Sequence, residues 1–115
     1  MNYMLFILFL LIAGHALGDY ALQNQYVADA KNRHTVQGKE VWWIVLTAHS
    51  LIHGAIVALI TSSVTLGVLE TIAHWITDYA KCEKMIDYKT DQFLHIIHKF
   101  IWFFIIIASG GFQPA

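Results

Sequence analysis

Residues 70–81 read Glu-Thr-Ile-Ala-His-Trp-Ile-Thr-Asp-Tyr-Ala-Lys and place ionisable side chains inside an apolar segment. Within this otherwise apolar segment, Glu70, His74 and Asp78 are four residues apart, and Lys81 follows three residues later. On an α-helix this spacing places the side chains along one face. Burying such groups is costly unless they meet a metal, a counter-charge or a water-filled cavity. The spacing therefore predicts partners elsewhere in the chain.

The composition is typical of an integral membrane protein. Of the 115 residues, 57% are hydrophobic and only 13% are charged, which does not fit a soluble domain of this size. Four apolar segments each approach the ~20 residues that a helix needs to cross a bilayer: residues 3–27, 41–62, 64–82 and 90–110. Because short connections make consecutive helices antiparallel neighbours, we expect an all-α, polytopic membrane protein. Its single domain, residues 1–115, would be a four-transmembrane-helix up-down bundle.

The number and placement of charged residues argue against nucleic-acid binding and indicate how the chain is oriented in the membrane. The formal net charge is -1, so no basic surface indicates nucleic-acid binding. Lysine and arginine concentrate in two connections, residues 29–40 and 81–89. By the positive-inside rule these connections face the cytoplasm and both termini lie outside the inner membrane. His34, in the first connection, is expected to be solvated.

Two further features of the chain have simple interpretations. The segment 3–27 lacks a positively charged leader, so we expect an uncleaved first membrane helix. The single cysteine, Cys82, cannot form an intramolecular disulfide and is interpreted as a spare thiol at a helix end.

The other apolar segments repeat the pattern of polar side chains at four-residue intervals. These are His15, Asp19 and Gln23 in the first, His49 and His53 in the second, and Asp91 and His95 in the fourth. Counted at ~1.5 Å per residue from the predicted cytoplasmic ends, these residues reach overlapping depths in the cytoplasmic half of the bilayer. If each polar face points to the bundle axis, the side chains converge on one site.

The residue types in that site favour a divalent metal. Imidazole and carboxylate together suit zinc, manganese or iron, and carboxylates can bridge two ions. Haem is a poorer fit because acidic groups accompany most of the histidines. The predicted metal ligands are His15, Asp19, His49, His74, Asp78, Asp91 and His95. Glu70 is left out because it reaches the same depth as Lys99, and the two could neutralise each other.

The leading functional hypothesis is a membrane-embedded, metal-dependent hydrolase. The metal would polarise the scissile group and lower the pKa of a bound water toward ~7. His53 is a further ligand or a general base. Lys81 and Gln23, nearer the headgroups, are candidates for holding an anionic lipid or phosphorylated substrate at the cytoplasmic leaflet. Lys81 is equally interpreted as a snorkelling anchor.

Three alternatives stay open at this point. The same residues could form the relay of a metal-ion or proton transporter or channel, which would need a homo-oligomer because four short helices leave little room for alternating access. The chain could be an interaction protein, such as a phage factor acting on a host membrane protein, with a purely structural metal. The polar residues could also form a hydrogen-bonded network that only sets helix register.

Taken together, the polar motifs resemble a known family. They comprise residues 14–23 with Lys31 after them, His49 with His53, residues 74–81, and residues 91–95. On these motifs the chain resembles the domain of unknown function 3307 family of bacterial and phage membrane proteins, which implies a polar site but no established reaction. It is also more weakly similar to small membrane-bound proteins named metal-dependent hydrolases.

Overall fold

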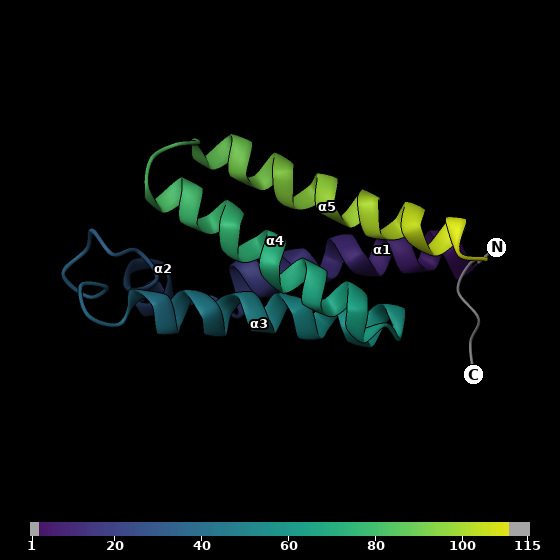
Figure 1. Cartoon of the computed structure of the whole chain (residues 1–115), viewed down its shortest axis with the longest axis horizontal. Coiled ribbons are helices and arrows are strands. Elements are labelled where there is room, and N and C mark those ends of the chain that lie inside the picture. Colours follow the sequence, from purple (N-terminus) through teal and green to yellow (C-terminus); the bar gives the residue numbers. More distant parts are fainter. Residues whose placement is uncertain (1–2, 111–115) are drawn as a thin grey trace.

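The computed structural model describes residues 3–110, and all regular secondary structure across that range is helical. The elements are α1 (Tyr3–Ala16), a π-helical turn η1 (Leu17–Ala21), α2 (Gln25–Ala30), α3 (Trp42–Thr61), α4 (Val64–Cys82) and α5 (Tyr88–Ala108). The four long helices run in alternating directions along one axis (Figure 1). The start of α1 and the end of α5 lie at one end of the bundle, while α2 and the connection from α4 to α5 lie at the other. The predicted all-α class is confirmed.

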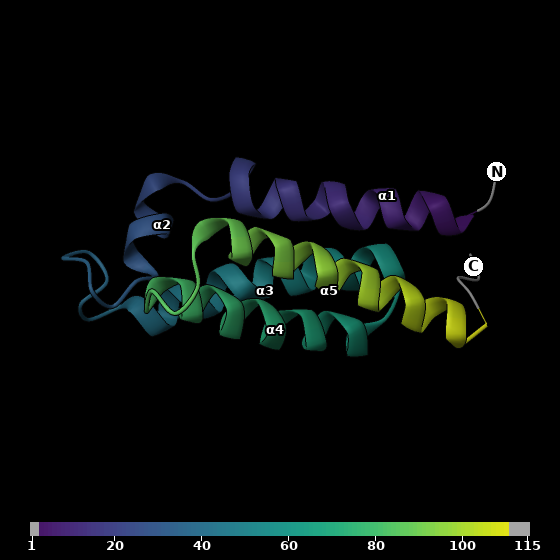
Figure 2. The same ribbon diagram turned by 90° about the horizontal axis from the view of Figure 1, so that it is seen from above.

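The first predicted helix is wrong in its last six residues. Instead of continuing to residue 27, it ends at Ala21, and α2 begins at Gln25. The side chain of Asn24 accepts a hydrogen bond from the Val27 backbone N–H at 2.9 Å, and this alternative partner favours a new helix start over continuation. Figure 2 shows α2 crossing the end of the bundle from the level of α1 to that of α3. The polar connection therefore begins after Ala30.

Helices α3 and α4 form the closest pair, joined by a tight turn. Ser62 adopts a left-handed conformation with φ 55°, and the Ser63 hydroxyl accepts a hydrogen bond from the Leu66 N–H. A Cβ atom on Gly54 would lie 2.6 Å from the backbone oxygen of Gly67. The two backbones can approach this closely only because both positions are glycine.

An apolar core fills the half of the bundle nearer the start of α1 and the end of α5. Its buried members come from all four long helices: Ile7, Leu11, Val57, Leu66, Trp102, Phe103 and Ile106. The buried histidines and aspartates lie toward the other half. Along its axis, the interior of the bundle is thus apolar in one half and polar in the other.

Three helical stretches are long and apolar enough to cross a membrane: Tyr3–Ala21, Trp42–Thr61 and Tyr88–Ala108. Helix α4 does not belong to this set. It has 19 residues, but it carries Glu70, Asp78 and Lys81, whose charges lower its hydropathy. The prediction of membrane-compatible helices is confirmed for three segments, and a fourth span stays a prediction.

Candidate metal centre

The long helices bring every predicted metal ligand into one buried cluster. We call the following eight residues the donor cluster: His15, Asp19, His49, His53, His74, Asp78, Asp91 and His95. Their exposed fractions range from 0% to 7%. They come from α1, η1, α3, α4 and α5. Each of the four long helices therefore contributes at least one residue to the cluster, and the π-helical turn that continues α1 contributes Asp19.

Asp19 occupies the middle of the donor cluster. Its Oδ1 lies 2.8 Å from Nε2 of His53, 3.2 Å from Nε2 of His49 and 3.5 Å from Nε2 of His74. Four ligands placed ~2.0 Å from a tetrahedral zinc would be separated by roughly 3.3 Å. The separations from Asp19 are close to that value, and Asp19, His53 and His74 belong, with His15, to a group whose donor atoms all lie within 4.8 Å of one another. These four residues could hold an ion with small adjustments.

Asp78 forms a second focus on α4. Its Oδ1 lies 3.0 Å from Nε2 of His95, and its Oδ2 lies 3.4 Å from Nε2 of His74. Oδ2 also accepts a hydrogen bond from Lys31 Nζ at 2.7 Å. Asp91, on α5, places Oδ1 at 3.2 Å from the same His95 nitrogen.

The donor atoms form three overlapping groups in which all atoms lie within 4.8 Å of one another. The groups are His15, Asp19, His53 and His74; His49, His74 and Asp78; and Asp19, Asp91 and His95. His74 belongs to the first two and Asp19 to the first and third. Shared donors between adjacent groups are what a site for two neighbouring ions requires.

His74 is buried in a way that a bound cation would compensate. This side chain is fully buried, and neither ring nitrogen forms a hydrogen bond within residues 3–110. Its ring lies between those of His53 and His95, with centroid separations of 3.7 Å and 4.1 Å. Buried polar atoms without hydrogen bonds cost free energy. The nearest groups to Nε2 are carboxylate oxygens of Asp78 and Asp19, at 3.4 Å and 3.5 Å, so a cation held between them would remove that cost for one nitrogen.

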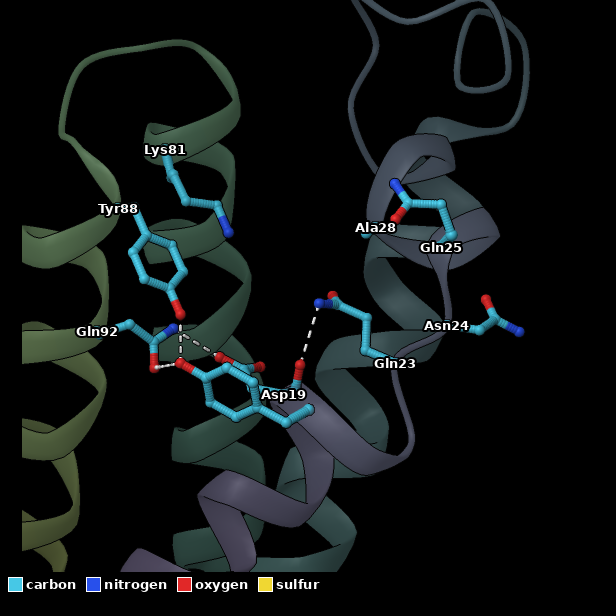
Figure 3. Close-up of a pocket in the computed structure, with 9 residues that line it drawn as sticks. Asp19, Gln23, Asn24, Gln25, Ala28, Lys81, Tyr88 and Gln92 are labelled. Atoms are coloured by element: carbon cyan, nitrogen blue, oxygen red, sulfur yellow. Dashed lines mark hydrogen bonds between the residues drawn. The ribbon is translucent and has the colours of Figure 1, made fainter.

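Gln23 and Lys81 lie at the rim of the donor cluster, where the sequence predicts substrate contacts. Gln23 donates a hydrogen bond to the Asp19 backbone oxygen at 3.2 Å. Lys81 Nζ lies 3.8 Å from Asp91 Oδ2, and the lysine side chain is 24% exposed. Both residues line a cavity of about 240 Å³ that reaches Asp19 (Figure 3). The other lining residues are Tyr20, Asn24, Gln25, Ala28, Tyr88 and Gln92.

Sequence reasoning missed Lys31 and Gln92 as site residues. Lys31 is only 2% exposed and donates hydrogen bonds to Asp78 and, at 2.6 Å, to Gln23. Gln92 donates to Asp19 Oδ2 at 2.9 Å and contacts His15 Nε2 at 3.0 Å. Lys31 follows the helix break, so helical spacing does not place it in the site. Both residues do belong to the motifs on which the chain resembles the domain of unknown function 3307 family, and that was the signal that could have found them.

Glu70 and Lys99 form a buried ion pair outside the three donor groups. Lys99 Nζ donates to Glu70 Oε1, and the two residues are 1% and 0% exposed. The expected pairing is confirmed. His98, three residues after His95, also lies outside the donor groups, and its ring packs against that of Trp102.

His34 is exposed as expected, but it is part of an ion network at the surface. Its Nε2 lies 2.6 Å from Glu83 Oε2, and Arg33 donates to the same carboxylate through Nε at 3.0 Å and through a second nitrogen. Hydrogen bonding by Arg33 lowers the pKa of Glu83 to about 2. The network ties the connection after α2 to the end of α4.

Comparison with known proteins identifies the family. The family described as "Protein of unknown function (DUF3307)" matches residues 6–113, almost the whole chain, and this chain therefore belongs to it. No curated protein and no solved structure matches the chain. The resemblance to the domain of unknown function 3307 family is thus confirmed, and the family description names no activity.

Proposed function

We propose that this chain is a membrane-embedded, divalent-metal-dependent hydrolase whose donor cluster lies in the cytoplasmic half of the bilayer. One observation carries the proposal: overlapping histidine and aspartate groups share His74 and Asp19, and a polar cavity reaches Asp19 from outside. Zinc, manganese and iron all accept such ligands. A divalent ion held there would polarise a scissile group and activate a water.

The side chains around the cavity have separate roles in this proposal. Asp19 and His74, shared between donor groups, would hold one or two ions. His53 lies 2.8 Å from Asp19 Oδ1 and serves either as a ligand or as the general base that takes a proton from the attacking water. Burial of the remaining donors excludes bulk water and strengthens their electrostatic effect.

The proposed membrane orientation follows from charge and from the ends of the bundle. Residues 29–40 and 81–89 carry most of the lysine and arginine, and both lie at the end of the bundle that contains α2 (Figure 1). With that end in the cytoplasm, the chain would cross the inner membrane four times and both termini would lie outside. The charged side chains of α4 are paired with Lys31, Lys99 and Asp91. This pairing lowers the free-energy cost of placing α4 in the bilayer as a fourth span.

Two observations favour the hydrolase over the alternatives. A transporter needs polar groups toward both surfaces, whereas the half of the bundle opposite the donor cluster is filled by Leu11, Val57, Phe103 and other apolar side chains. A purely structural metal needs no access, whereas the cavity reaches Asp19. A relay through several copies of the chain would require a path that bypasses this apolar core.

Elemental analysis of the detergent-purified protein tests metal binding. We expect stoichiometric zinc, manganese or iron in the wild type and a clear loss in His95→Ala, because His95 belongs to a donor group. The matched control is His98→Ala, which removes a histidine from the same helix but from outside the groups. Wild-type protein without stoichiometric metal would contradict the proposal. It would favour the alternative in which the polar residues form a hydrogen-bonded network that only sets helix register.

An activity measurement separates hydrolysis from structural metal binding. Metal-loaded protein is incubated with chromogenic phosphate-ester and amide substrates before and after chelation. We expect turnover that stops on chelation and returns when the metal is restored. Bound metal without turnover of any substrate would favour the structural role.

A further inference from the structure

We propose that the cavity beside Asp19 binds the phosphate group of a phosphate monoester, and that it does so only when the donor cluster holds metal. This inference rests on the proposed function and names the substrate class of that site. We call the cavity, with the nine lining residues given above, the rim cavity.

The walls of the rim cavity carry the donors that a phosphate group needs. Lys81 supplies a cation from α4, and the Gln23 amide, which gives one hydrogen bond to the Asp19 backbone oxygen, has a second N–H as a neutral donor. The Gln92 amide donates to Asp19 and Asp91 and fixes the wall between them. In Figure 3 the Lys81 amine and the Gln23 amide point into the same space from opposite walls. The volume of about 240 Å³ exceeds by far what one water requires.

The position of Lys81 favours binding an anion over anchoring at the headgroups. A snorkelling lysine extends its amine to water, whereas Lys81 turns inward, with a side chain only 24% exposed and Nζ 3.8 Å from Asp91 Oδ2. That separation is too long for a hydrogen bond. Among the described residues no side chain or backbone oxygen accepts a hydrogen bond from Lys81, so its N–H groups can bind a ligand.

Lys31 is not available for the same role. Its ammonium is buried and donates to Asp78 Oδ2 and Gln23 Oε1 at 2.7 Å and 2.6 Å. Among the residues that line the rim cavity in the described chain, Lys81 is thus the one cation.

The charges of the donor cluster make phosphate binding dependent on metal. Its three carboxylates face two lysines, Lys31 and Lys81, and His95 Nε2 lies between the carboxylates of Asp78 and Asp91. The metal-free cluster therefore has no excess positive charge to attract an anion, whereas each divalent ion adds two positive charges. Phosphate should therefore bind much more tightly to the loaded site than to the metal-free one.

Two tyrosines mark the entrance of the rim cavity. The hydroxyl groups of Tyr20 and Tyr88 are hydrogen-bonded to each other, and Tyr20 also donates to Gln92 at 3.3 Å. The two side chains are 57% and 54% exposed, and tyrosine is enriched at the headgroup level of membranes. A phosphate monoester can therefore arrive from the cytosol or as a lipid headgroup.

Binding of radiolabelled inorganic phosphate to the full chain in detergent tests the proposal. Saturation is measured on metal-free protein and on protein loaded with manganese. We expect saturable binding only after loading. A second arm replaces inorganic phosphate with phosphatidic acid in phosphatidylcholine vesicles. Competition by the lipid that exceeds competition by soluble glycerol phosphate would identify the membrane as the source, and the reverse would identify the cytosol.

Variants of Lys81 separate the rim cavity from general electrostatic attraction. Lys81→Gln removes one charged contact and should weaken phosphate binding to the loaded protein by about tenfold, while bound manganese is retained. Lys81→Arg should restore most of the affinity. The control Lys89→Gln removes an exposed lysine beside Tyr88 and should leave binding within about twofold, because exposed charges are screened by salt.

The outcomes distinguish this inference from the proposed function. Metal binding without phosphate binding would overturn the inference alone, as would phosphate binding that is equal with and without manganese or unchanged in Lys81→Gln. Failure of the wild type to bind any metal would overturn both.

Discussion

Lys31 shows how one side chain fixes the geometry of a neighbouring carboxylate. Its ammonium holds Oδ2 of Asp78, and Oδ1 of the same group lies 3.0 Å from His95 Nε2. The carboxylate therefore cannot rotate without breaking a buried, charge-assisted hydrogen bond. Lys31 is a positioning residue that keeps Asp78 directed at the histidines.

The buried pair of Glu70 and Lys99 gives a prediction about stability without a change in metal content. Lys99→Met leaves the fully buried Glu70 carboxylate without its cation, so the free energy of unfolding should fall by about 3 kcal/mol. The double variant Glu70→Gln with Lys99→Met should recover most of this loss. Thermal unfolding in detergent measures the effect, and elemental analysis should find wild-type metal in both variants. Metal loss in Glu70→Gln would instead place Glu70 in the ligand set.

The surface network around Glu83 predicts a dependence of stability on pH. The hydrogen bond from Arg33 lowers the Glu83 pKa from 4.5 to about 2. Because the folded-state pKa is lowered, the carboxylate stabilises the fold above about pH 4.5, and this contribution disappears as the pH falls to about 2. The difference in melting temperature between wild type and Glu83→Gln should therefore shrink across that range. Glu40→Gln, which removes an exposed carboxylate in the connection that carries Arg33, is the matched control, and an equal shrinkage there would contradict the assignment.

At the scale of elements, the π-helical turn is the feature that directs the site. Residues Leu17–Ala21 depart from α-helical geometry, and Asp19 within this turn reaches histidines on α3 and α4. π-Helical turns are rare and often occur at functional sites. A Cβ on Gly18 would lie 2.6 Å from the His53 ring, so the turn packs directly on a donor side chain.

The spacing between α3 and α4 gives a prediction at this scale. In Gly54→Ala the new methyl group would meet Thr71 Oγ1 at 1.9 Å and the Gly67 backbone oxygen at 2.6 Å. The backbone cannot rotate away as a side chain can, so we expect the helices to separate and the free energy of unfolding to fall by about 1–3 kcal/mol. Leu59→Ala is the control, because Leu59 on the same helix is 82% exposed. Equal melting temperatures for Gly54→Ala and the wild type would show that the helices do not need this contact.

At the scale of the whole molecule, the position of the donor cluster matters more than any single ligand. The cluster lies toward the α2 end, while the opposite half is apolar. A site that opens toward one surface is suited to a substrate that enters and leaves from the same side. This asymmetry underlies the preference for hydrolysis over transport.

Labelling of single cysteines tests the proposed orientation. In a Cys82→Ser background, cysteine is introduced at Val36 or Met85, which are 92% and 73% exposed, or at the exposed Ser109. We expect a membrane-impermeant maleimide to label Val36→Cys and Met85→Cys only in inverted vesicles, and Ser109→Cys only in right-side-out spheroplasts. Helices α3, α4 and α5 lie between these two positions. If Val36→Cys and Ser109→Cys were labelled from the same side, the three helices could not all cross the membrane.

The amino-acid sequence predicts the helical class and the residue types that the helices bring together. Apolar segments of about 20 residues predict helices because a backbone in lipid must satisfy its own hydrogen bonds. Histidine and aspartate at four-residue intervals predict a common face because the helix has 3.6 residues per turn. These two periodic signals predict the seven residues proposed as ligands, which the structure brings into the three donor groups, and counting depth along the helices predicts the pairing of Glu70 with Lys99.

The contacts made between the periodic segments could not be predicted in the same way. The break at Asn24, the burial of Lys31 and the bridging by Gln92 depend on local capping and on contacts across many residues. Such contacts leave no repeating pattern in the sequence, because loops and side-chain networks are not periodic. The rim cavity belongs to the same class of feature, since it exists only where η1, α2, α4 and α5 meet.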